Sequence, residues 1–420
     1  MNKVTFAFKN ITNQKVGRLA ELWKYDSGAL LLSSPVVEDI DNDGKKEIIF
    51  GTKNGSILSI DMDGNLKWVF SAQETISDVE LMFLDTESAN SINSSPNIDD
   101  INNDGKKEII FGTEAGKLYV LDSKGKLLWN YKVEGPIRGS PLIQKFSNNV
   151  TGILFGSTDK NLYFLNSGGK LFWKYDAKSE IESCPTIVIG KRTLIVFGSN
   201  DGTIHALNLK GELVWTFQTQ GKILAQPVFD RLVKNSPPVI IIGSTDGTVY
   251  CLSEDGERIW KYHTEGAICS KVTIADIDND ERKEILFGSC DNSVYAIDPN
   301  GKKIWSYETD FWIVASPIVS DMDGDGRLEV VVGSYDHNIY ILDAEGTYVL
   351  DYVPGVSGIV GQTGHYGDAI TKEPGRTQGK KIWQYQTEGV IVGCAYVHEK
   401  NNLIVNTDLG RINNIVHKNE

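Results

Sequence analysis

The chain has 420 residues and a net charge of −14, and 41 of its residues are glycine. Its acidity disfavours a nucleic-acid partner, which would need a basic stripe, and adhesion to an anionic membrane surface. No run of about 18 apolar residues is present, so we expect no insertion into a membrane. Residues 1–10 also lack the apolar stretch of a secretory signal, which favours the cytoplasm.

Four short strands are predicted between residues 34 and 70, at 34–37, 47–50, 56–60 and 66–70. Short runs of β-branched and aromatic residues bounded by Gly, Asp and Asn are typical of strands joined by tight turns. No stretch longer than about ten residues has a helical period, so we expect almost no helix.

The fourth of these strands carries a phrase that recurs eight times: an apolar residue, a tryptophan, a variable residue and an aromatic. In the first unit Lys67 precedes Trp68 and breaks the apolar rule. Such a period of about 40–50 residues, built from short strands, predicts a β-propeller. We expect each tryptophan to pack on the neighbouring blade, where its indole N–H needs a partner. The eight are Trp23, Trp68, Trp129, Trp173, Trp215, Trp260, Trp305 and Trp383.

The unit occurs eight times, and its last copy, from Cys394 to Val416, lacks a tryptophan strand. A strand at residues 21–26 precedes every inner strand, so we predict that it completes the eighth blade. The prediction is one all-β domain over residues 1–420, an eight-bladed propeller of four-stranded blades. Wider spacing between tryptophans places insertions near residues 72–92 and 347–379.

The repeated string is Gly-x-x-x-Trp-x-aromatic, then Ser-Pro, then an aliphatic strand that ends in Gly-Ser or Gly-Thr. It resembles the repeats of the pyrroloquinoline-quinone-like (PQQ-like) eight-bladed propellers over roughly residues 21–416. That family contains quinoprotein dehydrogenases and also cofactor-free scaffold proteins. The resemblance therefore implies the fold and leaves the activity open.

Four blades carry the spacing Asp-x-Asp/Asn-x-Asp-x-x-x-Glu between their first and second strands. Alternating oxygen ligands on a tight loop suit Ca²⁺, which takes six to eight oxygens; the seventh position would offer its backbone carbonyl. The loops, with the Phe-Gly that follows three of them, resemble the FG-GAP calcium repeats of integrin-type propellers. The alternative is an acidic, solvated turn without metal. The predicted ligands are Asp39, Asp41, Asp43, Lys45, Glu47, Asp100, Asn102, Asp104, Lys106, Glu108, Asp276, Asp278, Asp280, Arg282, Glu284, Asp321, Asp323, Asp325, Arg327 and Glu329.

Polar residues break the repeat near the inner strands of blades three to six, at Arg138, Glu182, Gln226 and Lys271. Inner strands line the central channel, so these four are expected to converge on a rim that binds a ligand. The alternative is ordinary pore lining with water. Trp312 stands outside the repeated phrase and is expected either in the core or exposed near the channel mouth.

No catalytic signature is present: there is no vicinal cysteine pair, haem motif, metalloprotease motif or phosphate loop. The five cysteines have no paired spacing and predict no disulfide framework. We therefore favour a monomeric, non-catalytic, calcium-stabilised scaffold that binds a protein or carbohydrate partner. The alternative is a quinone- or metal-dependent oxidoreductase with its site at the channel mouth. A lyase or hydrolase of polysaccharides, using Glu182 and Lys271, is a third possibility. Calcium loops, in contrast to the missing signal sequence, would favour a location outside the cell.

Overall fold

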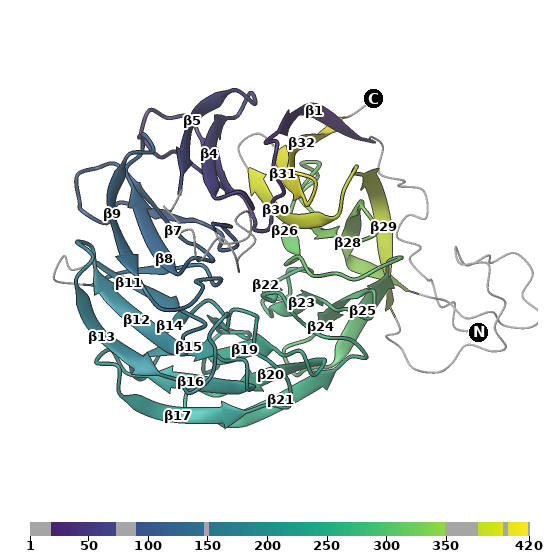
Figure 1. The fold of residues 1–420 in the computed structure, drawn as a ribbon. Coiled ribbons are helices and arrows are strands. Elements are labelled where there is room, and N and C mark those ends of the chain that lie inside the picture. The colour runs from purple at the N-terminus through teal and green to yellow at the C-terminus, as the bar shows by residue number, and fades with distance from the viewer. Residues whose placement is uncertain (1–17, 73–89, 147–150, 349–376, 398–401, 419–420) are drawn as a thin grey trace, which may run out of the picture.

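The computed structural model describes residues 18–72, 90–146, 151–348, 377–397 and 402–418. The regular structure of these residues is entirely β, with eight antiparallel four-stranded sheets and no helix. In Figure 1 the sheets stand as blades in a ring around a central axis. The predicted eight-bladed all-β propeller is therefore confirmed.

The first four blades follow one another along the chain. Blade one contains β2 (Val36–Glu38), β3 (Glu47–Gly51), β4 (Ser56–Asp61) and β5 (Leu66–Ser71). Blade two contains β6 (Asn97–Asp99), β7 (Glu108–Gly112), β8 (Lys117–Leu121) and β9 (Leu127–Lys132). Blade three contains β10 (Leu142–Lys145), β11 (Thr151–Gly156), β12 (Asn161–Asn166) and β13 (Leu171–Asp176). Blade four contains β14 (Thr186–Ile189), β15 (Thr193–Gly198), β16 (Thr203–Leu207) and β17 (Leu213–Gln218).

The remaining blades keep the same order until the ring closes. Blade five contains β18 (Val228–Asp230), β19 (Val239–Gly243), β20 (Thr248–Leu252) and β21 (Arg258–His263). Blade six contains β22 (Thr273–Ala275), β23 (Glu284–Gly288), β24 (Ser293–Ile297) and β25 (Lys303–Glu308). Blade seven contains β26 (Ile318–Ser320), β27 (Glu329–Gly333), β28 (Asn338–Tyr348) and β29 (Thr377–Gln386). Blade eight contains β30 (Ile391–Val397), β31 (Asn402–Thr407), β32 (Arg411–Lys418) and β1 (Arg18–Asp26).

The N-terminal strand closes the ring as predicted. β1 pairs antiparallel with β32, from Arg18 opposite Lys418 to Asp26 opposite Arg411. Figure 1 shows the purple β1 beside the yellow β32. The strand begins at Arg18, three residues before the predicted start, because its pairing with β32 continues through Arg18, Leu19 and Ala20.

Burial differs between the strands of a blade and explains their composition. The second strand is buried throughout, as in the run Glu47–Gly51 of β3, whereas the outer strand β5 alternates between exposed and half-buried residues. The second strand is covered on both faces by neighbouring blades, which favours a continuous apolar run. The outer strand has one face toward a neighbour and the other toward solvent.

Seven of the eight repeated tryptophans join one blade to the next through the indole N–H, as predicted. Trp68 of blade one donates its indole N–H to the carbonyl of Ser123 in blade two at 3.1 Å. Its ring lies over Gly125, where an added Cβ would come within 2.6 Å of the indole. The same bond to a carbonyl of the next blade, at 2.9–3.1 Å, is made by Trp23, Trp68, Trp129, Trp173, Trp215, Trp260 and Trp305.

The two predicted insertions fall mainly on residues 73–89 and 349–376, which lie outside the described part. The described part contains no helix with the length and hydropathy needed to cross a membrane.

Candidate functional site

The connections of the blades divide between two faces of the ring. The turns between second and third strands, and the segments that lead from one blade to the next, lie at one end of the strands; we call this the rim face. The loops between first and second strands lie at the other end, which we call the loop face. All four acidic loops are on the loop face, whereas Arg138, Glu182 and Trp312 are on the rim face.

The four acidic loops share one backbone shape. The fourth residue has positive φ of 58°, 62°, 59° and 75° at Asn42, Asn103, Asn279 and Gly324. The sixth has positive φ of 82°, 85°, 66° and 84° at Gly44, Gly105, Glu281 and Gly326. Glu281 therefore takes the left-handed conformation of the glycine it replaces, at a cost of about 1–2 kcal/mol. Its carboxylate forms an ion pair with Lys234 at 3.1 Å.

Backbone N–H groups orient the aspartates of each loop. Asp39 Oδ1 accepts the N–H of Asp43 at 3.2 Å, and its Oδ2 accepts the N–H of Gly44 at 2.9 Å. Asp43 in turn accepts the N–H of Lys45 at 2.8 Å. The equivalent bonds occur in the other three loops, around Asp100, Asp276 and Asp321.

The ninth-position glutamate of each loop is buried. Glu47, Glu108, Glu284 and Glu329 are each at most 3% exposed. One carboxylate oxygen of each accepts the N–H of the loop's second residue, at 3.1 Å from Ile40, 3.0 Å from Ile101, 3.0 Å from Ile277 and 2.7 Å from Met322. Burial raises the pKa of Glu47, Glu108 and Glu284, because a charged carboxylate is costly away from water.

Three loops bring acidic oxygens close enough to share one cation. The groups are Asp39, Asp41 and Asp43 in blade one, Asp276, Asp278 and Glu284 in blade six, and Asp321, Asp323 and Asp325 in blade seven, each with oxygens within 4.8 Å of one another. In blade two the amide of Asn102 donates to Glu108 Oε1 at 2.9 Å and to Asp104 at 3.2 Å. An amide thus occupies the interior of that loop.

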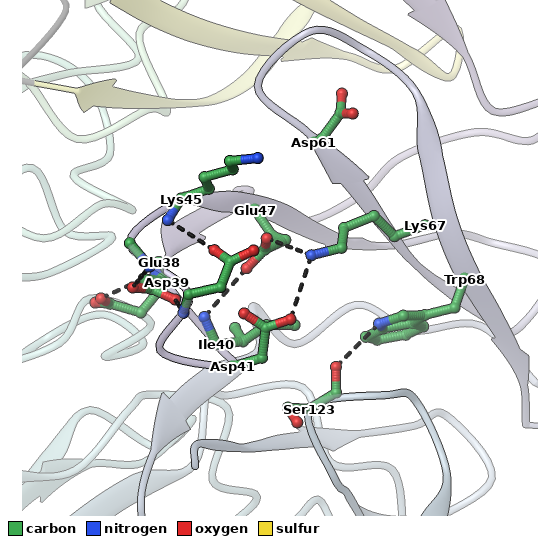
Figure 2. Close-up of polar contacts among 12 residues, drawn as sticks. Glu38, Asp39, Ile40, Asp41, Lys45, Glu47, Asp61, Lys67, Trp68 and Ser123 are labelled. Carbon is green, nitrogen blue, oxygen red and sulfur yellow. Dashed lines mark hydrogen bonds and ion pairs between the residues drawn. The ribbon is translucent and has the colours of Figure 1, made fainter. Parts of the chain in front are cut away.

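Blade one differs because a lysine side chain enters its loop. Lys67 Nζ lies 2.6 Å from Glu47 Oε1 and 3.5 Å from Asp41 Oδ2, as Figure 2 shows. Asp41 Oδ1 is buried and has no hydrogen-bond partner among the described residues.

Blade six has no such ammonium. Glu284 is 3% exposed, and among the described residues it forms no ion pair. Burial and the neighbouring Asp278, Asp280 and Asp276 raise its pKa to about 7, despite the bond from Ile277. Accumulated negative charge without a counter-charge is the arrangement that a bound cation relieves.

On the rim face, Arg138 joins two blades through a polar network. Its guanidinium donates to both oxygens of Glu114, at 2.8 and 3.0 Å, and contacts Glu182 at 3.3 Å. Asn93 donates to Glu114 at 2.7 Å, and Asn200 donates to Glu182 at 2.8 Å. These carboxylates raise the pKa of Arg138.

The structure brings Arg138 and Glu182 together but places Gln226 and Lys271 in other surroundings. Gln226 donates to the hydroxyl of Thr186 at 3.2 Å. Lys271 makes no hydrogen bond or ion pair with another described residue, although its charge opposes the rise in the pKa of the Cys184 thiol that burial causes. A paired acid and base formed by Glu182 and Lys271 is not seen among the described contacts.

Sequence reasoning missed Glu114, Asn93 and Asn200 as members of the network. Glu114 and Asn200 follow the Gly-Thr or Gly-Ser that ends the second strand, so this turn position was the available signal. The repeat fixes the position, but it does not indicate which neighbouring side chain reaches it.

Exposed apolar side chains occupy the rim face over blades seven, eight and one. Phe311 and Trp312 are 46% and 45% exposed, and their rings lie 5.2 Å apart. Trp312 is therefore exposed rather than part of the core. The backbone of Trp312 accepts the N–H of Tyr335 at 2.9 Å. We call the exposed set the apolar sector; it comprises Leu30, Leu32, Phe311, Trp312 and Leu409.

Backbone contacts bring the blade-eight turn with Leu409 beside the segment that carries Leu30. Lys53 donates its N–H to Leu30, which ties the β3–β4 turn to the segment that leads into blade one. An added Cβ at Gly410, next to Leu409, would come within 2.3 Å of the Ala29 carbonyl. Burial raises the pKa of Tyr335, whose backbone N–H bonds to Trp312, and the negative charge of Asp408 in blade eight raises it further.

Two family models match the chain. One, described as "Beta-alanine-activating enzyme, beta-propeller", matches residues 90–353. The other, described as "Outer membrane protein assembly factor BamB", matches residues 16–152. No curated protein matches the chain.

Solved structures share the fold at low sequence identity. BamB from Moraxella catarrhalis has a TM-score of 0.64 at 17% identity, covering 96% of this chain and 98% of its own. The C-terminal WD40 domain of Sif2 has a TM-score of 0.60 at 14% identity, covering 96% and 99%. BBS1N in complex with ARL6DN has a TM-score of 0.50 at 13% identity, covering 77% and 91%.

The first family model spans more than half of the 420 residues, and the structure has the eight blades that the repeats predict. The chain therefore belongs to the propeller family whose model is described as "Beta-alanine-activating enzyme, beta-propeller", and this family lies among the PQQ-like repeat β-propellers.

Proposed function

We propose that this chain is a non-catalytic scaffold that binds a protein partner through its rim face and is stabilised by calcium on its loop face. The observation that supports partner binding most directly is the apolar sector. It places two adjacent aromatic rings and three leucines on the surface of three consecutive blades.

Covering exposed apolar side chains of this kind with a partner removes them from water, which favours association. Aromatic side chains are enriched in protein interfaces, and a polar surround excludes competing contacts. The network of Arg138, Glu114 and Glu182 provides such a polar surround on the neighbouring part of the same face. A partner whose surface has an apolar centre and complementary charges at its edge would fit both the apolar sector and the Arg138 network.

The similar structures support a binding role at the level of the fold. BBS1N was solved in complex with ARL6DN, and BamB is named as an assembly factor. Both names describe proteins that associate with others. A propeller offers such proteins a rigid disc whose connections vary without disturbing the blades.

The calcium proposal rests on the donor set of the loop face. Carboxylate and carbonyl oxygens on a tight turn suit Ca²⁺, as in the integrin-type loops that this spacing resembles. Glu284, Asp276 and Asp278 in blade six, and Asp321, Asp323 and Asp325 in blade seven, would hold the ion. Bound calcium would supply the positive charge that these carboxylates lack. Its binding free energy would add to the stability of the folded blades.

Partner binding is tested by comparing capture on two faces of the same scaffold. The double variant Phe311→Ser/Trp312→Ser removes the aromatic pair, and Ile189→Ser changes a 69% exposed apolar residue at the loop-face end of β14 as the control. Proteins crosslinked to the wild type are identified, and each is then purified and titrated against all three chains. We expect a partner that binds the wild type and Ile189→Ser but loses at least about tenfold in affinity for the double variant.

Two results would contradict this function. Equal affinity for the double variant would remove the rim face as the binding surface. Glycan binding would contradict the protein partner if it changed the tryptophan fluorescence of the wild type but not of the Phe311→Ser/Trp312→Ser variant.

A further inference from the structure

The outer strand of blade one differs from the others at the residue before its tryptophan. Lys67 stands there, whereas the other three blades with acidic loops have Leu128, Ile304 and Ile382. All four residues immediately precede the tryptophan of strands β5, β9, β25 and β29. The lysine is therefore a feature of blade one alone among the blades with acidic loops.

Lys67 reaches the interior of the blade-one loop. Its Nζ lies 2.6 Å from Glu47 Oε1, a residue that is 1% exposed, and 3.5 Å from Asp41 Oδ2. Figure 2 shows the ammonium between these two carboxylates, with its aliphatic stem running back to the strand that carries Trp68. A buried carboxylate that is paired in this way has its charge compensated within the protein.

This contact removes Glu47 from the oxygens available to a metal. Glu47 Oε2 accepts the N–H of Ile40 at 3.1 Å, and Oε1 accepts Lys67, so each oxygen already has a donor. The oxygens that cluster in blade one belong to Asp39, Asp41 and Asp43, without Glu47, just as those of blade seven belong to Asp321, Asp323 and Asp325. Asp41 Oδ1, buried and without a partner among the described residues, is the oxygen that a metal ion would gain if the lysine were absent.

Blade six shows the same loop without a built-in cation. Ile304 replaces the lysine, and Glu284 lies within 4.8 Å of the oxygens of Asp276 and Asp278. The glutamate is thus diverted by an ammonium in blade one and is free to join the acidic cluster in blade six.

We propose that Lys67 is the resident cation of the blade-one loop, so that this loop does not take calcium while the loops of blades six and seven do. The inference rests on the proposed calcium loops. A divalent ion and an ammonium that share Asp41 and Glu47 repel each other, so occupation by one disfavours the other. In blade one, the outer-strand residue before the tryptophan is then the position that decides whether the loop needs metal.

The test replaces Lys67 with the residue found in blade two. Lys67→Leu is compared with the wild type, with Lys67→Arg, which keeps a cation, and with Lys174→Leu, an exposed outer-strand lysine in a blade without an acidic loop. Each purified chain is dialysed against calcium and its bound metal is counted. Terbium luminescence excited through the tryptophans gives a second reading of the same sites.

We expect Lys67→Leu to bind about one more calcium ion per chain than the wild type, and both control variants to keep the wild-type count. We also expect Lys67→Leu to unfold at a lower temperature than the wild type in chelator and to recover when calcium is added. An unchanged calcium count and an unchanged response to calcium in Lys67→Leu would overturn the proposal.

The reciprocal variant keeps the test decisive if Lys67→Leu does not fold. Ile304→Lys places the lysine in blade six and is expected to lose about one calcium ion relative to the wild type; retention of that ion would contradict the inference. The test also distinguishes failure of the Lys67 proposal from failure of the calcium proposal. A wild type that binds no calcium, beside a Lys67→Leu chain that binds an ion, would refute the calcium sites of blades six and seven and support the role of Lys67.

Discussion

The indole nitrogen of Trp68 lies 3.1 Å from the carbonyl oxygen of Ser123, and this bond crosses from blade one to blade two. The same ring covers Gly125 in the turn that follows Ser123. One side chain thus supplies both a hydrogen bond and a packing surface between blades. Its repetition around the ring explains why the outer strand of every blade contains a tryptophan.

Replacing Trp68 with phenylalanine should lower the free energy of unfolding by about 1–2 kcal/mol. Phenylalanine keeps most of the packing but leaves the Ser123 carbonyl without its donor. The measurement is denaturant unfolding of the variant and the wild type. The matched control is Trp312→Phe, because Trp312 is 45% exposed and makes no bond of this kind; its effect should stay within about 0.5 kcal/mol. Equal losses for the two variants would show that the bond between blades contributes nothing.

Gly125→Ala should destabilise the protein more than Gly28→Ala. Both glycines have positive φ, of 77° and 72°, so each alanine carries the same backbone strain of about 1–2 kcal/mol. Only at Gly125 does the new Cβ meet the Trp68 ring, at 2.6 Å, whereas Gly28 has nothing within 4 Å. We expect an additional loss of about 1–3 kcal/mol at Gly125, measured as the difference between two denaturation curves. Identical curves would mean that the tryptophan moves aside at no cost.

Stability at acidic pH should depend on His205. Its ring stacks on Phe197 with centroids 4.9 Å apart, and burial lowers its pKa from 6.5 to about 4, against the opposing charge of Asp201. The unfolded chain therefore takes up a proton at a higher pH than the folded chain does. The contribution of neutral His205 to the free energy of unfolding is complete above about pH 6.5. It is lost as the pH falls toward 4, by up to about 3 kcal/mol.

His205→Tyr tests this pH dependence with the residue that other blades use. In blades three, five, six and seven, a tyrosine at the equivalent position donates its hydroxyl to an aspartate four residues earlier, at 2.7–2.9 Å. Asp201 stands at that position in blade four. The variant should lose less stability between pH 7 and 5 than the wild type, when both are followed by denaturant unfolding in the same buffers. A parallel decline in both chains would assign the acid sensitivity to other groups.

The Arg138 network should matter little for folding. Its side chain is 40% exposed, and exposed ion pairs contribute about 0–1 kcal/mol. Arg138→Gln should therefore shift the unfolding curve by less than about 1 kcal/mol. The same substitution should slow association with the partner of the rim face, because charges at the edge of an interface act mainly on the association rate. A large loss of stability would instead show that the network stabilises the packing between blades.

Repetition made the fold predictable. Eight copies of the tryptophan phrase specify eight outer strands, and the surplus N-terminal copy at Trp23 predicted the closure through β1 and β32. The acidic loops were predictable for the same reason, because their spacing recurs at one place in the repeat. Glu281 is an instructive exception, since it adopts a glycine-like φ of 66° that its side chain disfavours.

Contacts between different parts of the repeat were not predictable. Lys67 was visible in the sequence as a break in the apolar pattern, but its contact with Glu47 depends on how β5 approaches the loop between β2 and β3. The rim residues show the same limit. The Arg138 guanidinium donates a hydrogen bond to Glu182, whereas the Gln226 amide donates to Thr186. A position in a repeat specifies the strand and the face, and the side-chain direction depends on the neighbours.

The most direct test of the account is thermal unfolding of the full chain in excess calcium and in excess chelator, with a metal count on the same sample. The account predicts about two calcium ions per chain and an unfolding temperature raised by at least about 5 °C in calcium. It also predicts that Glu284→Gln lowers both values, because this residue contributes to the blade-six cluster. A chain that binds no metal and unfolds at the same temperature in both conditions would contradict the calcium-stabilised scaffold and leave the acidic loops as solvated turns.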